Sequence, residues 1–408
     1  MGQNPGTNHP RMLTALQRAK QNGAKIITIN PLAEAGLKKF KHPQNPVDML
    51  GTGTVLTDIF LQVRVNGDVP LLKAILKLLL ERENEKPGSV FDHDFIQKKT
   101  SGFEDFLADL SGYDLDALVE QSGVALNEIK RAVDLLAQKE KIIVCWAMGL
   151  TQHKNAVDNI REVVNLLLLK GSIGKPGAGT CPVRGHSNVQ GDRTMCIFEK
   201  LKPEFGEKLK AEFHFEPPKK EGYDVLGAIE AMKKGKAKVF FAMGGNFLSA
   251  TPDTELTAKA LQGCELTVQV STKLNRSHLV HGRTAIILPC LGRTELDVQD
   301  SGPQFISVEN STGVVHQSRG GKMPVSDSLL SEPKIVAELA VATLKSSKTD
   351  WRNLVSNYDM IREAIEITIP GFEINNERVR RPGGFYLPNG ARDGDYRKEP
   401  GKAYFTIK

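Results

Sequence analysis

The chain has 408 residues, of which 40% are hydrophobic and 25% are charged. These ordinary values exclude a disordered tail, a collagen-like repeat and a coiled coil as the main architecture. A single hydrophobic core stops growing at about 250–300 residues, so two or more domains are expected. The longest apolar runs are interrupted by lysine or asparagine, and none reaches the roughly 18–20 apolar residues of a membrane span.

The net charge of +6 is modest, and the basic residues are spread along the chain, of which only 6% is aromatic. A nucleic-acid groove would combine clustered basic residues with aromatics, so a small anionic ligand such as a diphosphate is favoured over nucleic acid. The amino-terminal residues do not resemble a signal peptide. The five cysteines are far apart and form no C-x-x-C pair, which favours a reducing cytoplasm and predicts buried, inert thiols.

Short apolar strands, each followed by a Gly, Asn or Pro turn and an amphipathic helix, recur along the chain and are typical of parallel α/β architecture. In chain order, strands are expected over residues 25–29, 141–144, 238–241, 266–270 and 285–288. Helices are expected over residues 12–22, 70–82, 127–138, 157–168, 225–234 and 254–261, because apolar residues there recur at helical spacing.

The segments outside this pattern are predicted to be connections. Residues 217–220 and 346–350 indicate surface loops, and residues 378–408, rich in Arg, Gly, Pro and Asp, indicate a loop or tail. The run Gly2-Gln-Asn-Pro-Gly6 has the composition of a turn that follows a parallel strand. We therefore expect the sequence to be an internal piece of a longer protein.

Turns that follow parallel strands gather at the carboxyl edge of the sheet, where free N–H groups can bind phosphate. Residues 2–8, 148–153 and 243–247 are candidate diphosphate cradles, and residues 271–276 add hydroxyls and cations. Taken singly, each turn is more often an ordinary loop. No G-x-G-x-x-G follows a strand, which counts against an ordinary NAD-binding unit.

Residues 174–191 combine glycine turns with Arg184, His186, Asn188 and Gln190. So many hydrogen-bonding side chains in one loop indicate a bound ligand, although composition alone equally fits a solvated polar loop.

Several motifs occur in a fixed order: Gly2-Gln-Asn-Pro-Gly-Thr-Asn-His-Pro10, Met148-Gly-Leu-Thr-Gln-His153, Gly174–Gly179 with Pro182-Val-Arg-Gly-His-Ser-Asn-Val-Gln-Gly191, and Met243-Gly-Gly-Asn246. Together they resemble the molybdopterin oxidoreductases of the DMSO reductase superfamily. Ser271-Thr-Lys-Leu-Asn-Arg-Ser-His278, followed by Ile287-Leu-Pro-Cys-Leu-Gly-Arg-Thr-Glu295, resembles the formate dehydrogenase alpha-subunit-like branch. The resemblance extends over most of residues 1–345.

The resemblance implies a molybdenum ion held by two molybdopterin guanine dinucleotides, each bound by one of two Rossmann-like parallel-sheet domains. Residues 1–183 would form the first domain, 184–345 the second, and 346–408 an extension toward a further carboxyl-terminal domain. The residues that match cofactor-binding positions are Gln3, Asn4, Pro5, Gly6, Asn30, Gly67, Asp68, Gly149, Thr151, Gln152, His153, Gly185, His186, Gly244, Gly245, Asn246, Ser271, Thr272, Lys273, Asn275 and His278. Asn30 stands where many relatives have Asp, and His186 stands where formate dehydrogenases usually have Gln.

Arg184 matches the arginine that formate dehydrogenases place beside the metal to hold the substrate carboxylate. A guanidinium suits that role, because its fork binds a carboxylate in two places and stays charged. The resemblance also implies an electron-transfer partner, and it assigns the metal ligand and a 4Fe–4S cluster to an amino-terminal part that this sequence does not contain. Two alternatives remain open: a cofactor-binding fragment without activity, and an ordinary nucleotide-dependent dehydrogenase.

Overall fold

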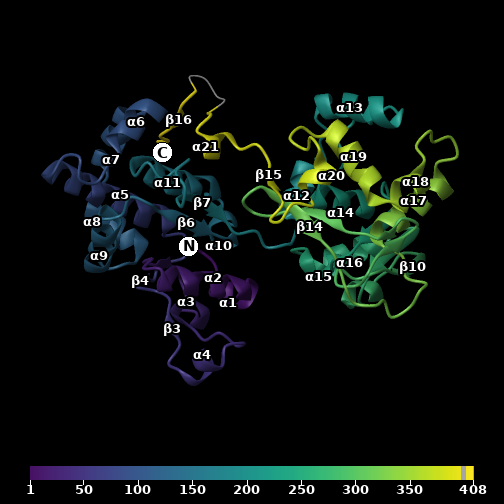
Figure 1. Ribbon diagram of the computed structural model, residues 1–408, viewed down its shortest axis with the longest axis horizontal. Coiled ribbons are helices and arrows are strands. Elements are labelled where there is room, and N and C mark those ends of the chain that lie inside the picture. The colour runs from purple at the N-terminus through teal and green to yellow at the C-terminus, as the bar shows by residue number, and fades with distance from the viewer. Residues whose placement is uncertain (397–400, 408) are drawn as a thin grey trace. The chain divides into compact units, whose positions relative to one another are not determined.

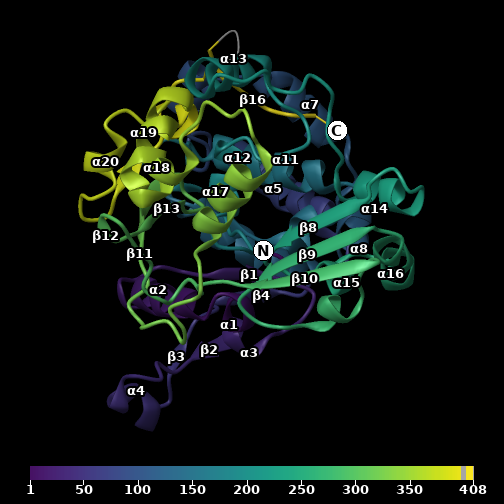
Figure 2. The same cartoon turned by 90° about the vertical axis from the view of Figure 1, so that its right-hand side faces the viewer.

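The computed structural model describes residues 1–396 and 401–407. The chain forms two compact units, which Figures 1 and 2 show as ribbons. Unit 1 consists of Met1–Ser187 together with Pro388–Lys408, and unit 2 consists of Asn188–Leu387. Within the described residues, no helix combines the length and the apolar character that crossing a membrane requires.

Two parallel strand pairs form the centre of unit 1. Strand β1 (Ile27–Ile29) pairs with β4 (Ile59–Leu61), and β6 (Ile143–Trp146) pairs with β7 (Gly179–Pro182). The strands are short, and β1, β4 and β6 consist mostly of apolar residues, whereas β7 is Gly-Thr-Cys-Pro and Ile143 of β6 is 56% exposed. The expected strands at residues 25–29 and 141–144 are therefore confirmed, with their bounds shifted by two residues or fewer.

Four long helices pack around these strands: α2 (Pro10–Gln21), α5 (Asp68–Glu85), α9 (Leu126–Ala137) and α11 (Ala156–Leu169). Helix α5 is buried over most of residues 71–80, because it is surrounded by α7, α8, α9 and α11. The remaining elements of unit 1 are α1 (Pro5–Asn8), α3 (Ala35–Lys38), β2 (Lys39–Phe40), α4 (Pro46–Leu50), β3 (Thr54–Val55), α6 (His93–Lys99), β5 (Thr100–Ser101), α7 (Phe103–Gly112), α8 (Leu115–Ser122), α10 (Met148–Thr151), α21 (Gly390–Asp393) and β16 (Ala403–Tyr404).

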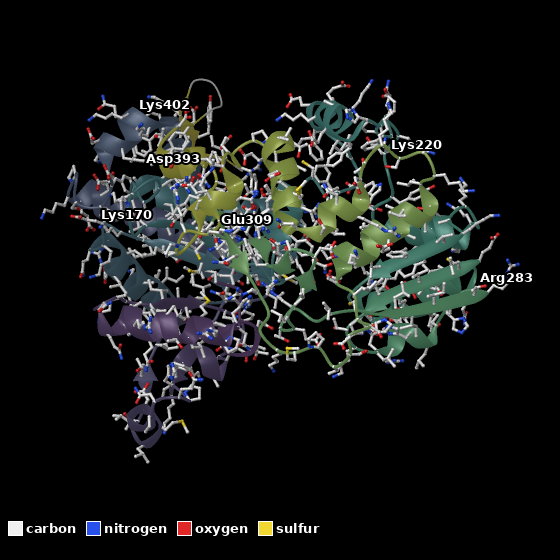
Figure 3. The ribbon with its side chains drawn as sticks, turned by 45° about the vertical axis from the view of Figure 1, so that its right-hand side comes forward. Lys170, Lys220, Arg283, Glu309, Asp393 and Lys402 are labelled. Atoms are coloured by element: carbon white, nitrogen blue, oxygen red, sulfur yellow. The ribbon has the colours of Figure 1, made fainter. Side chains whose placement is uncertain are left out.

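Two lysines of unit 1 are buried and paired. Lys73 lies 3.0 Å from the carboxylate of Glu162 on α11. Lys170, labelled in Figure 3, donates to the carbonyl oxygens of Val90 and Ala137 at 2.7 and 3.2 Å. Their ammonium groups are satisfied inside the protein, so each lysine joins elements that are distant in sequence.

The carboxyl-terminal end of the chain belongs to the core of unit 1, and the expectation of a loop or tail over residues 378–408 is wrong there. Strand β16 pairs in parallel with β5, and the Phe405 ring stacks on Phe106 at a centroid distance of 5.0 Å. The Thr406 N–H donates to the side chain of Asn165 at 3.0 Å. These contacts join residues that are far apart in sequence, so the composition of the segment does not reveal them. Residues 397–400 lie outside the described part.

Unit 2 contains an unbroken parallel sheet in the order β10-β9-β8. Its strands are β8 (Val239–Met243), β9 (Leu266–Ser271) and β10 (Thr284–Pro289), close to the expected ranges. Helices α14 (Val225–Lys233) and α16 (Thr254–Gln262) pack on it through a small apolar cluster.

The other elements of unit 2 include an antiparallel sheet, β13-β14-β15, that the sequence patterns did not predict. They are α12 (Val189–Thr194), α13 (Pro203–Phe213), α15 (Phe247–Ala250), the 3-10 helix η1 (Arg276–Leu279), β11 (Val298–Gln299), β12 (Gly302–Pro303), β13 (Ile306–Glu309), β14 (Val314–Ser318), α17 (Glu332–Thr343), α18 (Trp351–Ser356), α19 (Tyr358–Thr368), α20 (Asn375–Arg378) and β15 (Phe385–Tyr386). Residues 346–387, expected to belong to an extension, lie within unit 2.

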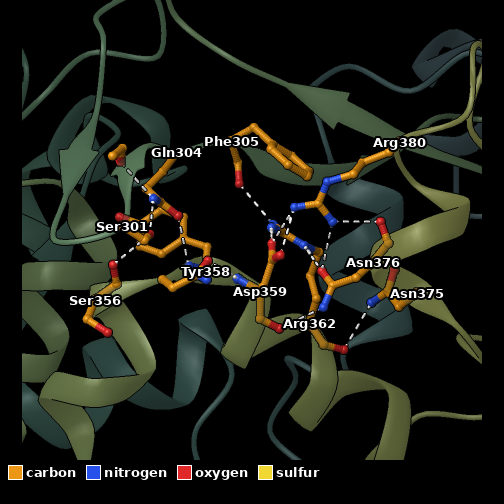
Figure 4. Close-up of polar contacts among 12 residues, drawn as sticks. Ser301, Gln304, Phe305, Ser356, Tyr358, Asp359, Arg362, Asn375, Asn376 and Arg380 are labelled. Atoms are coloured by element: carbon orange, nitrogen blue, oxygen red, sulfur yellow. Dashed lines mark hydrogen bonds and ion pairs between the residues drawn. The ribbon is translucent and has the colours of Figure 1, made fainter.

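A polar cluster holds α19 and α20 against the loop before β13 (Figure 4). The buried Arg362 guanidinium lies over the Phe305 ring at 3.9 Å and donates to Asn376 at 2.7 Å. It also pairs with Asp359, which accepts a second arginine, Arg380, at 2.7 Å. This cluster lies beside a small apolar cluster of unit 2 that includes Phe372 and Phe385.

Candidate functional site

A cavity of about 530 Å³ opens at the carboxyl edge of the unit 1 strands. Its walls come from the turns after β1, β4, β6 and β7 and from the amino-terminal turn. The lining residues are Gly2, Gln3, Asn4, Asn8, His9, Asn30, Pro31, Leu32, Glu34, Val63, Arg64, Val65, Asp68, Ala147, Met148, Gly149, His153, Val183, Gly185 and His186. Convergence of several strand ends at one edge is the usual location of ligand sites in open α/β sheets.

Two backbones approach closely at the base of this cavity. The Gly149 N–H donates to the Gly2 carbonyl at 3.0 Å. A Cβ atom on Gly149 would lie 2.5 Å from the Gly2 oxygen, and Gly2 itself has a φ of +53°. Only glycine permits this approach at both positions. The amino-terminal turn is thereby held against the turn after β6.

Buried polar atoms in the cavity wall lack a partner within the described residues. They are the side-chain oxygen of Gln3 and Nδ1 of His9. The other ring nitrogen of His9, Nε2, lies 2.8 Å from the Arg184 carbonyl oxygen, which fixes the ring. Buried polar atoms are normally hydrogen-bonded, so these two fit a polar ligand in the cavity.

Asp68 is the one acidic residue of this cavity that is almost fully buried. Its exposed fraction is 5%, and it begins helix α5. Burial raises the pKa of Asp68, and the opposing charges of His153 and the amino terminus offset this only in part. A carboxyl group kept in such surroundings costs stability, which is typical of functional positions.

Asn30 and His153 have structural partners at the cavity rim. The Asn30 amide donates to the Leu32 carbonyl at 2.8 Å, so its donor is used to shape the loop. The His153 ring lies 2.8 Å from the Gly149 carbonyl, which closes the one-turn helix α10. Helices α1, α10 and α15 have only four residues each, so the predicted phosphate cradles do not lie at the ends of long helices.

The structure brings most of the predicted residues of unit 1 to this cavity, but not all of them. Gln3, Asn4, Asn30, Asp68, Gly149, His153, Gly185 and His186 line it. Pro5 faces a different cavity, between β1 and β6, and Thr151 and Gln152, at the end of α10, are exposed. Gly6 and Gly67 have structural roles, because a Cβ atom would lie 3.0 Å from Gly36 Cα and 2.9 Å from the Ser122 oxygen, respectively.

Arg184 is exposed and lies between two residues that line the cavity. Arg184, Gly185 and His186 were expected in the second domain, yet they belong to unit 1. The reason is the parallel pairing of β7 with β6, which carries the segment after Pro182 to the same edge.

The list of predicted site residues left out four polar residues of this cavity: Asn8, His9, Glu34 and Arg64. The first two lie inside the motif that begins at Gly2, and Arg64 lies three residues before Gly67. The positions of these three residues inside or beside recognised motifs are the signal that would have found them.

Unit 2 has a corresponding cluster at the carboxyl edge of β8, β9 and β10. In Figure 3 the label Arg283 marks the opposite, amino-terminal end of β10. Gly244 and Gly245 have φ values of +69° and +77°, and a Cβ atom on Gly245 would meet nothing within 4 Å. The Gly245 position thus leaves open space above the strand end, into which a ligand could fit.

The loop after β9 is tied to the loop after β8 by side chains. Asn275 donates to the Gly245 carbonyl at 3.0 Å, and its oxygen accepts from the Ser277 N–H at 2.9 Å. The Ser277 hydroxyl donates to Asn246 at 2.5 Å. Ser277 is a buried link within the motif that the site prediction passed over.

The remaining predicted residues of unit 2 surround this link. His278 Nδ1 accepts from the Asn275 N–H at 3.0 Å, whereas its buried Nε2 lacks a partner within residues 1–396 and 401–407. Ser271 is buried at the end of β9, and Thr272 and Lys273 follow it in exposed positions. The cluster therefore combines an orphaned ring nitrogen, open glycine backbone and a cation, which fits an anionic ligand such as a diphosphate.

The cysteines are not all isolated. Cys145 and Cys181 are register partners on β6 and β7, and they share a hydrogen bond that lowers the pKa of Cys181. The expectation of buried thiols is correct for Cys264 and Cys290 but wrong for Cys145, Cys181 and Cys196, which are only partly buried. Among the described residues, His, Cys, Asp and Glu form no group of three or more that could hold a metal ion.

Comparisons with known proteins agree with this architecture. The family model described as molybdopterin oxidoreductase matches residues 1–289. An uncharacterized oxidoreductase of Mycobacterium bovis is 50% identical over 408 residues, which are the whole chain and 52% of the relative. Formate dehydrogenase H of Escherichia coli is 27% identical over 276 residues, covering 65% of this chain and 35% of the relative. The chain thus spans about half the length of the more similar of these two relatives.

Among solved structures, acetylene hydratase from Pelobacter acetylenicus superposes with a TM-score of 0.56 at 18% identity, covering 81% of this chain and 44% of that one. This likeness confirms the predicted fold, a mixed α/β architecture with parallel sheets. With a family model matching more than half of the residues, the chain belongs to the molybdopterin oxidoreductase family.

Proposed function

We propose that this chain forms the dinucleotide-binding core of an oxidoreductase that acts on formate or a similar small substrate. Each unit would hold one molybdopterin guanine dinucleotide of a shared molybdenum centre. The observation that carries the proposal is the convergence of five turns on the unit 1 cavity, where Gln3 and His9 present buried polar atoms without partners in the described part of the chain.

The bound cofactor would supply the two-electron redox chemistry. The chain would bind and orient it. In unit 1, the close Gly2–Gly149 approach would hold the amino-terminal turn and the turn after β6 side by side at the cavity, and Asp68 would offer a carboxyl group to a base or sugar. In unit 2, the open Gly245 backbone, Lys273 and His278 would do the same for the second dinucleotide.

Arg184 is the residue proposed to hold the substrate carboxylate. It follows β7 directly, and the hydrogen bond from its carbonyl to His9 joins its backbone to the amino-terminal turn. A guanidinium at this position could orient formate through two parallel hydrogen bonds while the reaction removes a hydride equivalent from carbon.

A 4Fe–4S cluster, the metal ligand and an electron-transfer partner belong to this proposal as parts outside the chain. The dispersed net charge supports a small-molecule ligand over nucleic acid, and no membrane contact is part of the proposal. The five cysteines, all of them free thiols, support a cytoplasmic location.

The first test measures cofactor content. The purified chain is analysed for molybdenum and iron by mass spectrometry and for GMP released by acid hydrolysis. We expect about two GMP per molybdenum if both units bind a dinucleotide. A chain with molybdenum but no GMP would contradict the dinucleotide form.

A glycine pair gives that test a matched control. Gly245→Ala should lower bound GMP, since the added Cβ enters the proposed phosphate position. Gly235→Ala imposes a similar strain, because Gly235 has a φ of +67° and also has no atom within 4 Å of a Cβ. Equal GMP loss in both variants would assign the effect to backbone strain and reject the cradle.

The substrate role of Arg184 is tested in the cofactor-loaded enzyme. Arg184→Lys should reduce kcat/KM for formate by about 10–100-fold at unchanged molybdenum content, because lysine lacks the bidentate fork. Normal kinetics would remove Arg184 from substrate binding. A retained cofactor without activity toward formate would support the alternative that this chain is a binding module.

A further inference from the structure

A second cavity of unit 1, of about 470 Å³, lies between strands β1 and β6. Five consecutive residues on each side line it, Lys25–Ile29 and Lys141–Cys145. Apolar side chains of the surrounding helices complete the walls, among them Leu16 of α2, Ile75 of α5 and Leu136 of α9. The cavity is therefore a largely apolar space bounded by two strand edges, with Lys25, Lys139 and Lys141 also in its walls.

The backbone pairing shows which groups of β1 face this space. The Asn30 N–H donates to Leu61 at 3.2 Å, and the Ile26 carbonyl accepts from Asp58 at 2.9 Å. The even-numbered residues of β1 thus point toward β4. Because backbone polar groups alternate sides along a strand, those of Ile27 and Ile29 point away from β4, toward the cavity.

The backbone groups of β6 alternate in the same way. The Ile142 carbonyl accepts from Gly179 at 2.9 Å, and the Trp146 carbonyl accepts from Val183 at 2.7 Å. The even-numbered residues of β6 point toward β7, so the polar groups of Ile143 and Cys145 face the cavity. Within the described residues, these two edges pair with no strand, and they face each other across a largely apolar space.

Met1 and Gly2 already occupy the carboxyl end of this space as strand residues would. The Met1 amine donates to the Cys145 carbonyl of β6 at 2.7 Å, and the Gly2 N–H donates to the Ile29 carbonyl of β1 at 3.1 Å. Successive N–H groups of a strand point to opposite neighbours, and these two do so. Burial lowers the pKa of the Met1 amine to about 6.

We propose that the cavity is a strand-binding slot, whose occupant is an extended, β-branched apolar segment joined through a peptide bond to Met1 and parallel to both β1 and β6. Its register follows from the bonds already present. The residue two positions before Gly2 would donate to the Ile27 carbonyl, and the residue two positions before Met1 would donate to Ile143. The unit 1 strands would then form one continuous five-stranded parallel sheet.

The apolar walls determine the chemistry of the occupant. A central parallel strand is covered on both faces, so its side chains are apolar throughout rather than alternating. The opposed edges supply backbone partners to both sides of the segment, which is the mode of binding by strand addition. Such a strand would also anchor the turn of Gln3 and His9 at the carboxyl-edge cavity.

The test compares two amino-terminal fusions of the full chain by amide hydrogen exchange. One carries Val-Ile-Val-Val-Ile before Met1, and its control carries Val-Pro-Val-Pro-Ile, which lacks N–H donors at two positions. In the first fusion, we expect exchange of Ile27, Ile29, Ile143 and Cys145 to slow at least tenfold. Thr28 and Val144, which face β4 and β7, should change by less than threefold.

Protection of all six amides alike would indicate general stabilisation and overturn the strand register, as would protection that is equal in the proline control. If the fusions fail to fold, the unmodified chain is mixed with the free Val-Ile-Val-Val-Ile peptide at millimolar concentration, and the same odd-numbered amides are followed. Their protection supports the slot, and its absence rejects it.

A second copy of the chain is the rival occupant. In that case, the odd-numbered amides of the unmodified chain would become more protected as the protein concentration rises, and light scattering would show a dimer. This result would reject the peptide-bonded segment. None of these readouts depends on molybdenum, GMP or activity, so their failure is distinguishable from failure of the proposed function.

Discussion

The two units place most of their predicted site residues at the same structural position, the carboxyl edge of parallel strands, but they are stabilised differently. Unit 1 is built on a large apolar core around α5, in which Leu71, Ile75 and Leu79 have exposed fractions of 1% or less. The apolar clusters of unit 2 are small, and polar networks around Tyr358 and Arg362 lie between its helices and loops.

The parallel sheet of unit 2 is also partly exposed on one face. In unit 2, Val239, Phe241 and Met243 of β8 are 59%, 37% and 40% exposed, so that face of the strand is not covered within the unit. Ligand-site geometry therefore depends on strand order and turn position, whereas the source of stability varies from unit to unit. The chain has two tryptophans, Trp146 in unit 1 and Trp351 in unit 2, which allow the units to be followed separately.

The largest expected effect is in the apolar core of unit 1. Leu79→Ala should reduce the free energy of unfolding by about 4 kcal/mol, because it removes buried methyl groups and leaves a cavity. Denaturant unfolding followed by Trp146 fluorescence, in a Trp351→Phe background, measures it. Leu50→Ala is the control, since Leu50 is 92% exposed, and it should change stability by less than about 0.5 kcal/mol. Equal losses would disprove the core assignment.

In unit 2, the comparison predicts that removing the buried Arg362 guanidinium lowers stability. Arg362→Met should cost about 3 kcal/mol, because it leaves the Phe305 carbonyl and Asn376 without their buried donor. Trp351 fluorescence in a Trp146→Phe background reports it. Arg352→Met removes an arginine that pairs with Glu338 at the surface and should have little effect. If Arg362→Met left the free energy of unfolding unchanged, apolar packing alone would support this unit.

The loop link in unit 2 should have a smaller effect. Asn275→Ala removes the cap of η1 and the bond to Gly245, and should cost about 1 kcal/mol. Asn275→Asp restores the acceptor for Ser277 but not the donor to Gly245, so it separates the two contributions. Full recovery of stability in Asn275→Asp, measured by thermal unfolding, would show that the bond to Gly245 contributes nothing.

The smallest effect concerns the buried carboxyl group in unit 1. Because the pKa of Asp68 is raised, the folded state binds its proton more tightly than the unfolded state, and this residue lowers stability as pH rises above its unfolded pKa. Asp68→Asn should therefore raise the free energy of unfolding at pH 7 and give no gain at pH 3. Asp116→Asn, at the exposed start of α8, should show no such gain. If Asp68→Asn raised the free energy of unfolding equally at both pH values, the raised pKa of Asp68 would not be the cause.

Much of the fold could be predicted from sequence because its signals are local. The helices α2, α5, α9, α11, α14 and α16 lie within about two or three residues of their expected bounds, and all five expected strands exist. The spacing of apolar residues and the positions of turn residues are set within short stretches of chain. They can therefore be recognised in a single sequence. The carboxyl-edge position of the turns follows once the strands are parallel.

What the sequence by itself determined is therefore the α/β class, the order of the elements and the family motifs whose residues meet at the two strand edges. Only the tertiary structure decided that residues 184–186 belong to unit 1, that Phe405 returns to its core, and that Cys145 lies beside Cys181. These features depend on contacts between residues far apart in the chain. No local pattern encodes them, because strand pairing and burial are properties of the assembled sheet and core rather than of any one segment.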